Sequence, residues 1–202
     1  MVVSPTAAFP DETLVVLPYS ESVAHAPGAA TGDYRFNLNS LFDPNATGSG
    51  HQPMASDTWD DFYFKYQVEE VDWELYICNA SATEITTIAA VPTNSVTSFA
   101  SDPDAAHENP SSQTAILAPL GSGAAATVMR GKVSLPTLSG RTRAQYVTEV
   151  SQYGANFGTN PAEILQLHIV SHAQSGGNVS VNFRIKMWFK TRLFDRVQLA
   201  SS

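Results

Sequence analysis

The feature that most constrains the fold is a strict alternation of side chains near the C-terminus, in VSVNFRIKMWFKTRLFDR, residues 179–196. Side chains of a β-strand point alternately to opposite faces, so residues two apart share a face. The odd positions form an apolar row that requires a hydrophobic core: Val179, Val181, Phe183, Ile185, Met187 and Phe189. The even positions form a basic row interrupted by one indole: Arg184, Lys186, Trp188, Lys190, Arg192 and Arg196. Such a strand belongs to a layered β-protein.

Shorter segments carry the same alternation. Tyr34, Phe36 and Leu38 share one face in DYRFNLNS, and Val71 and Trp73 begin the inward row of VDWELYIC. Further strand candidates are residues 12–23, 84–92, 113–120, 126–135 and 163–172. The best helix signal is SDTWDDFYF, with Ser56 as a possible cap, and residues 139–161 read as an exposed connection. Eight strands with long connections predict an all-β fold, an eight-stranded antiparallel jelly-roll sandwich with long loops and at most short helices.

The length and the cysteine content limit the organisation of the chain. Its 202 residues fit a single domain, 1–202, in which we expect residues 1–10 to form a flexible N-terminal segment. The single cysteine, Cys78, excludes an internal disulfide and reads as a small apolar strand residue. No run approaches the roughly 18 apolar residues of a membrane span, and no signal peptide is visible, so no membrane partner is predicted. Charged residues make up only 15%, as expected where neighbouring subunits cover the surface.

Charge is divided unevenly along the chain. Residues 1–129 contain 16 acidic and two basic residues, a net charge of −14, whereas residues 130–202 contain three acidic and nine basic residues, a net charge of +6. Arg130 and Lys132 share a face of their own predicted strand, opposite Met129 and Val133. If that strand and the last one lie in one sheet, their cations and Trp188 form a basic plateau. Cations for phosphates and an aromatic ring for stacking suit sequence-independent binding of single-stranded nucleic acid.

Two alternatives to this nucleic-acid face stay open. Glu70, Asp72 and Glu74 share the non-core face of their strand and are able to pair with the cations across strands. Burial of Trp188 against another subunit is the second alternative. The sequence therefore predicts the charged face but not its partner.

The stretch SLFDPNATGSGHQPMASDTWDDF, residues 40–62, concentrates residue types that are common in functional loops. A phosphate loop is excluded because its glycines do not lead into a helix and no lysine precedes Lys65. Its Asp and His residues lack the spacing of a calcium loop, so no metal site is predicted, although an ion shared between subunits stays open. We interpret the stretch as architecture, a turn-forming linker in which prolines fix the backbone and Gly48 and Gly50 allow positive φ. Its motif residues are Asp43, Pro44, Gly48, Gly50, His51, Gln52 and Pro53.

No arrangement of residues predicts catalysis or a cofactor. His168 and His172 point to the same face of one strand but lie about 13 Å apart, too far to bind one ion together, so they read as strand-surface residues. No Gly-x-Ser-x-Gly elbow occurs, and the His-x-His cluster of cupin enzymes is absent. The chain is therefore not expected to be an enzyme.

The block YRFNLNSLFDPNATGSGHQPMASDTWDDFYFKYQV resembles the capsid proteins of circular, Rep-encoding single-stranded DNA viruses, the circovirus-like group. The C-terminal pattern TNPAEILQLHIV, a Gly/Ser turn and VSVNFRIKMWFKTRLFDR is similar to that family too, and the resemblance spans roughly residues 11–199. It implies a viral jelly roll whose copies assemble as a sixty-subunit icosahedral shell around a circular single-stranded DNA genome. It also implies location in the virion, with assembly in the host nucleus as a possibility.

The chain departs from that family at its start. Family members commonly begin with an Arg/Lys-rich arm that binds the genome, whereas this sequence has no basic residue before Arg35. Either the arm has been removed, or the genome is packaged by another surface, which would give the basic row more importance. The alternative function is a cellular β-sandwich binding module of lectin type, with Trp59, Trp73 or Trp188 lining a sugar site.

Overall fold

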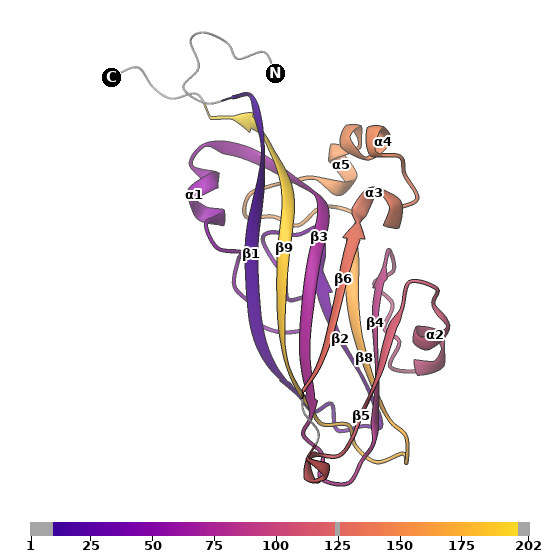
Figure 1. Cartoon of the computed structure of the whole chain (residues 1–202). Coiled ribbons are helices and arrows are strands. Elements are labelled where there is room, and N and C mark those ends of the chain that lie inside the picture. The colour runs from indigo at the N-terminus through magenta and orange to yellow at the C-terminus, as the bar shows by residue number, and fades with distance from the viewer. Residues whose placement is uncertain (1–9, 124–125, 198–202) are drawn as a thin grey trace.

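The computed structural model describes residues 10–123 and 126–197, which form two antiparallel sheets packed face to face (Figure 1). In spatial order the first sheet, here called the β1 sheet, contains β1 (Glu12–His25), β9 (Val181–Arg196), β3 (Tyr63–Asn79) and β6 (Thr127–Ser134). The two-residue β7 (Ala155–Asn156) also pairs with β3. The second, the β2 sheet, contains β2 (Thr31–Asn37), β8 (Gln166–Ala173), β4 (Thr86–Thr93) and β5 (Gln113–Leu117).

The connections between the eight longer strands follow the jelly-roll pattern. Only β4 and β5 are both consecutive and in the same sheet, and every other connection between consecutive long strands crosses from one sheet to the other. Each sheet therefore joins distant parts of the chain, as where β1 pairs with β9 from Glu12–Phe194 to His25–Val181. The predicted eight-stranded antiparallel jelly-roll sandwich is confirmed, with β7 as a short addition.

The core lies between the sheets and is built from the predicted apolar rows. Phe183, Ile185, Met187 and Phe189 of β9 are at most 4% exposed. They meet apolar side chains of both sheets, which include Tyr34, Phe36, Val71, Leu75, Ile77, Leu167 and Ile169. Each large side chain that is buried in this way contributes roughly 1.5–3 kcal/mol to folding. The alternation of the last strand thus specifies which of its faces meets the core.

Trp73 and Gly131 form a matched pair inside this core. They lie opposite each other on β3 and β6, and Trp73 is only 2% exposed. A Cβ atom built on Gly131 would lie 2.5 Å from the Trp73 ring. The glycine therefore provides the space in which the indole packs against the β6 backbone.

Helices in the described residues are short. They are α1 (Ser56–Asp60), α2 (Pro103–Glu108), α3 (Leu135–Leu138), α4 (Arg143–Thr148) and α5 (Val150–Tyr153), with one 3-10 helix, η1 (Leu120–Ser122). None of the helices in this part of the chain is long and apolar enough to cross a membrane. The prediction that Ser56 caps α1 was wrong: the N-cap is Ala55, which has positive φ, and Ser56 is buried inside the helix. The expected flexible segment 1–10 lies outside the described residues except for Pro10, whose carbonyl accepts a hydrogen bond from Tyr63.

The prediction of an exposed connection over residues 139–161 was also wrong in part. Thr142 and Gln145 form a capping box that starts α4, a signal that the sequence contained as Thr-x-x-Gln. Tyr146 is fully buried and donates a hydrogen bond to the carbonyl of Val68 at 2.9 Å, while Tyr153 stacks on it. The segment therefore packs onto β3 through two tyrosines.

The long connection between β4 and β5, residues 94–112, is called the excursion below and covers part of the outer face of the β2 sheet. Ala106 of α2 and Phe99 pack on Ala89, Val91 and Val170, which form a second apolar cluster. In Figure 1, α2 lies beside β4 and β8 on the side away from the β1 sheet. This outer face is therefore partly buried, whereas the outer face of the β1 sheet carries the basic row.

Candidate functional site

The basic row lies on the outer face of the β1 sheet, and the structure places an acidic strand through its middle. β6 and β9 lie in the same sheet, as the plateau prediction required, but β3 runs between them. Glu74 of β3 is opposite Arg130 of β6 on one side and opposite Lys186 of β9 on the other. Asp72 likewise faces Lys132 and Trp188. The alternative of cross-strand pairing with acids therefore describes a large part of this face.

Four residues at the centre of the face form a closed charge network. Lys132 lies 2.8 Å from Glu70 and 3.9 Å from Asp72. Lys190 also pairs with Glu70, and it lies 3.7 Å from Asp72. Burial by itself would raise the pKa of Glu70, but its bonds to Lys132 and Lys190 outweigh this effect and lower that pKa, while the bond to Glu70 raises the pKa of Lys190. The two positive and two negative charges of this network give it a net charge of zero.

The far end of the row, at the C-terminus of β9, is occupied by structural contacts. Arg192 lies 3.3 Å from Glu12 and donates hydrogen bonds to the Gln67 side chain at 2.7 Å and to the Val147 carbonyl at 3.0 Å. Its side chain is only 13% exposed. Arg196 lies 3.5 Å from Asp11. These two arginines hold β1, β3 and α4 together.

The near end of the row, which contains Arg184 and Lys186 in the N-terminal half of β9 and Arg130 on β6, has fewer contacts with carboxylates. Arg130 donates to Glu74 at 2.7 Å, and this bond, followed by one from Tyr76, lowers the pKa of Glu74. Arg184 donates to the neutral hydroxyl of Ser22 at 2.9 Å, and the Lys186 ammonium lies 5.5 Å from the centre of the Tyr76 ring. Among the described residues, neither Arg184 nor Lys186 forms an ion pair with a carboxylate. Positive charge therefore remains at this end.

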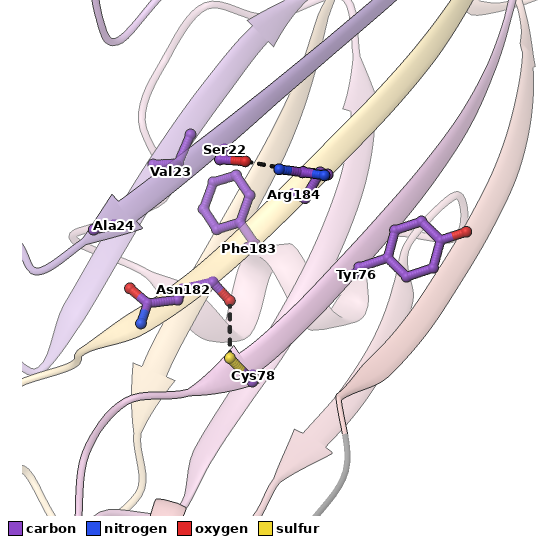
Figure 2. A pocket seen from close by; sticks show the side chains of 8 residues that line it. All are labelled: Ser22, Val23, Ala24, Tyr76, Cys78, Asn182, Phe183 and Arg184. Carbon is purple, nitrogen blue, oxygen red and sulfur yellow. Dashed lines mark hydrogen bonds between the residues drawn. The ribbon is translucent and has the colours of Figure 1, made fainter.

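Two hollows lie along β1 and β9 at this end of the face. One, of about 480 Å³, surrounds Arg184 and is shown in Figure 2, where Arg184 reaches Ser22 on β1 and Tyr76 stands on the neighbouring β3. Cys78 lies at its margin and donates to the Asn182 carbonyl. The other hollow, of about 440 Å³, is lined by Pro18, Tyr19, Ser20, His51, Gln52, Met54, Lys186 and Trp188. The contributions of Tyr76 and Met54 were missed from the sequence, although Tyr76 shares the parity of Asp72 and Glu74.

The second hollow joins the basic row to the motif loop of residues 43–53. The loop bonds the open edges of both sheets: Pro44 accepts from the backbone of Asn37 on β2, and the N–H of Met54, which follows the loop, donates to Pro18 on β1. The Asp43 carbonyl accepts from the Asn37 side chain at 2.7 Å. The loop therefore covers part of each edge, at Asn37 of β2 and at Pro18 of β1. The loop thus positions His51, Gln52 and Met54 beside Trp188.

The two motif glycines serve close packing and not unusual backbone angles. The expectation of positive φ at Gly48 and Gly50 was wrong, since neither is among the positive-φ glycines. A Cβ on Gly48 would lie 2.6 Å from the Tyr34 hydroxyl, and one on Gly50 would lie 2.7 Å from the Cβ of Asn45. Asn45 is buried, and its side chain bonds the Gly48 backbone and the Tyr34 hydroxyl. These glycines let the loop close over Asn45.

His51 and Tyr19 form the polar wall of the second hollow. The His51 ring lies 4.8 Å from the Tyr19 ring, and its Nε2 lies 3.1 Å from the Ser20 carbonyl. Tyr19 donates a hydrogen bond to Glu21. Burial, followed by that bond and the charge of Glu21, raises the pKa of Tyr19 far above its ordinary value. Tyr19 therefore stays a neutral donor.

A Gly50→Val substitution tests the packing role of the loop. The added side chain would displace Asn45 or Tyr19, and we expect a loss of about 1–3 kcal/mol in the free energy of unfolding, measured with urea. The control is Gly121→Val, because a Cβ on Gly121 meets no atom within 4 Å. Equal stability of the two variants would contradict the role assigned to Gly50.

His168 was predicted to be a strand-surface residue, and this was wrong. Its side chain is fully buried under the excursion and pairs through Nδ1 with Asp33, at 2.9 Å. Its Nε2 lies 3.1 Å from the Ser95 carbonyl, and Phe99 packs edge-on against the ring. His172 lies elsewhere on β8, with Nδ1 2.9 Å from the Thr31 hydroxyl. The two histidines do not form a common site.

Within the described part of the chain, no three His, Cys, Asp or Glu side chains come together as ligands for a metal ion. The aromatic residues proposed for a sugar site are also separated. Trp73 is buried in the core, and Trp59 packs against Phe62 and Tyr63. Of the three tryptophans, Trp188 alone lines a hollow described above.

No protein-family model and no curated protein sequence matches this chain. Solved structures, in contrast, are similar to it along its whole length. Desmodium yellow mottle tymovirus matches with a TM-score of 0.50 and 15% identity, covering 100% of this chain and 98% of that chain. The semi-empty VLP of Macrobrachium rosenbergii nodavirus, from the giant freshwater prawn, matches with a TM-score of 0.51 and 10% identity, covering 97% and 100%. These similarities establish the fold, a jelly roll of the kind found in viral particles, and do not single out a circovirus-like subunit.

Proposed function

We propose that this protein is a viral capsid subunit that associates with copies of itself into a closed shell, and that it acts without catalysis. The observations that carry the proposal are the complete jelly-roll strand order of this chain and its similarity in structure, over nearly the whole of each chain, to a tymovirus and to a nodavirus VLP. The low charged fraction of 15% supports the proposal, since it suits a surface that neighbouring subunits cover.

The finer form of the proposal is a sixty-subunit icosahedral shell around a circular single-stranded DNA genome, as the resemblance to circovirus-like capsid proteins implies. The support for it is the sequence of the Gly-His-Gln-Pro block, whose Gly50, together with Gly48 and Asn45 just before it, closes the loop described above. The subunit would then reside in the virion.

The mass of the purified protein tests this function directly. Light scattering after size exclusion should give about 1.3 MDa for a sixty-subunit shell of 21.7 kDa chains. The ratio of absorbance at 260 and 280 nm on the same peak reports packaged nucleic acid. A larger closed particle would keep the capsid function and correct the copy number. A monomer or small oligomer that binds glycans, with or without oligonucleotide, would overturn the proposal in favour of a lectin-like module.

A further inference from the structure

We propose that single-stranded nucleic acid binds along only one half of the basic row, on a track formed by Tyr76, Arg184, Lys186 and Trp188. We call these four residues the β9 track. The inference deepens the proposed function and rests on it for the identity of the bound strand as a packaged genome. Binding itself is argued from the charges, the rings and the hollows of this face.

Charge balance selects this half of the row. Lys132 and Lys190 are neutralised by Glu70 and Asp72, and Arg192 and Arg196 pair with Glu12 and Asp11. At the near end, Arg130 and Lys186 lie opposite Glu74 on either side, and Arg184 lies opposite Tyr76, so three cations share the single carboxylate of Glu74. Glu74 already accepts bonds from Arg130 and from the Tyr76 hydroxyl. The near end therefore has an excess of two positive charges, which a polyanion is able to neutralise.

The positions of these cations suit a ligand that runs along β9. Arg184 and Lys186 are two residues apart on the same face of one strand, so their Cα atoms lie about 7 Å apart. Arg184 is exposed, and its only hydrogen bond in the described structure goes to a neutral hydroxyl. Both cations are thus able to exchange a weak contact for a charge-assisted bond to a phosphate.

Aromatic groups adjoin both cations, with a hollow at each. Tyr76 borders the hollow around Arg184 (Figure 2), and Trp188 borders the hollow around Lys186. Trp188 is half-buried, and Met54, which is 73% exposed, lines the same hollow from the motif loop. Tyr76 lies opposite Arg184, and Trp188 follows Lys186 on the same face of β9. Rings that stand beside cations are the arrangement that binds unpaired bases and their phosphates without sequence preference. Stacking requires unpaired bases, so a single strand and not a duplex is the expected ligand.

Binding of oligothymidylate to the full chain tests the track. We expect the probe to quench tryptophan fluorescence, and the quenching to be lost in Trp188→Phe but kept in Trp59→Phe. Trp188→Ala should weaken binding by about 5- to 150-fold, the range for loss of one stacked base. Retained quenching in Trp188→Phe would overturn the assignment of this indole.

Salt dependence separates the track from general attraction. The double variant Arg184→Ala/Lys186→Ala should reduce the slope of log affinity against log salt by about 1.4, the contribution of two single-strand phosphates. The control, Lys132→Ala/Lys190→Ala, changes the net charge equally but removes cations that carboxylates already neutralise, so its slope should change much less. Equal changes in both variants, or a larger change in the control, would overturn the proposal.

Particle mass, recorded on the same samples, distinguishes failure of the track from failure of the capsid function. A protein that never assembles but shows Trp188 quenching and the expected slopes retains the track and loses the capsid function. Shells that form in the presence of oligothymidylate, with the same 260/280 ratio in wild type and in Arg184→Ala/Lys186→Ala, retain the capsid function and overturn the track.

Discussion

Replacing Gly131 by valine should destabilise the protein by about 3 kcal/mol, the upper end of the usual cost of overpacking a core. Even the first added carbon would lie 2.5 Å from the Trp73 ring, a separation at which something must move. Trp73 is 2% exposed between the sheets, so its indole has little free space into which to shift. For a chain of this size the change corresponds to a fall of about 6–12 °C in the melting temperature. Urea unfolding and calorimetry measure both quantities.

A double-mutant cycle identifies the cause. In a Trp73→Leu background the clash is gone, so Gly131→Ala should cost much less than in the wild type. Gly121→Ala, where the new Cβ meets nothing within 4 Å, should leave stability nearly unchanged. If Gly131→Ala costs the same in both backgrounds, the matched packing of Trp73 and Gly131 is not what requires the glycine.

Replacing Asp33 by alanine should be at least as damaging, with an expected loss of about 3–5 kcal/mol in the free energy of unfolding. The side chains of Asp33 and His168 are 1% and 0% exposed, so removal of the carboxylate leaves a buried ring without its partner. The ring lies between two acceptor groups, the Asp33 carboxylate at Nδ1 and the Ser95 carbonyl at Nε2. Asp33 also accepts from the Phe99 backbone, so the excursion should become sensitive to proteolysis.

The double variant Asp33→Ala/His168→Leu should lose less free energy of unfolding than the sum of the losses of the two single variants. Losses that simply add would contradict the interaction between Asp33 and His168.

The same pair predicts a dependence of stability on pH. Burial tends to raise the pKa of Asp33, but the hydrogen bond and charge of His168 and the bond from Phe99 outweigh it and lower that pKa. A carboxyl whose pKa is lower in the folded state contributes stability above its unfolded value of about 3.9, and this contribution is lost as the pH falls through the folded pKa. Unfolding measured at neutral pH and below pH 4 should therefore show a smaller loss in Asp33→Asn than in the wild type. A wild type and a variant that lose stability in parallel would count against this.

The glycines show why a pattern alone could not identify close packing. Gly48 and Gly50 suggested turns with positive φ, but the structure uses them to bring the loop against Asn45 and Tyr34. Gly131 gave no signal in the sequence, because its requirement comes from Trp73, a residue of another strand. A sequence shows that a position lacks a side chain, whereas only a packed neighbour shows what occupies the space.

The buried side chain of His168 shows in the same way that the sequence alone could not predict which outward-facing residues are covered. His168 lies on the non-core face of β8, and an alternating strand read by itself assigns such a position to solvent. The excursion that covers it comes from residues that follow β4, and its position on the sheet could not be read from its own composition. A face that is covered by a distant segment is therefore assigned correctly only from the tertiary structure.

The sequence by itself determined the strands and the core face of β2, β6, β9 and the second half of β3, because a period of two leaves only one face able to bury its apolar row. It also determined the basic row and, through the number of strands and their long connections, the jelly-roll class. The tertiary structure decided which charges remain unpaired. The chain is acidic before residue 130 and basic after it, yet strand order places the acids of β3 between the bases of β6 and β9. Charges act over distances in space and not along the sequence, so strand order leaves Arg184 and Lys186, beside Tyr76 and Trp188, as the cations of the row that form no ion pair among the described residues, although the charge of Lys186 acts on Glu74.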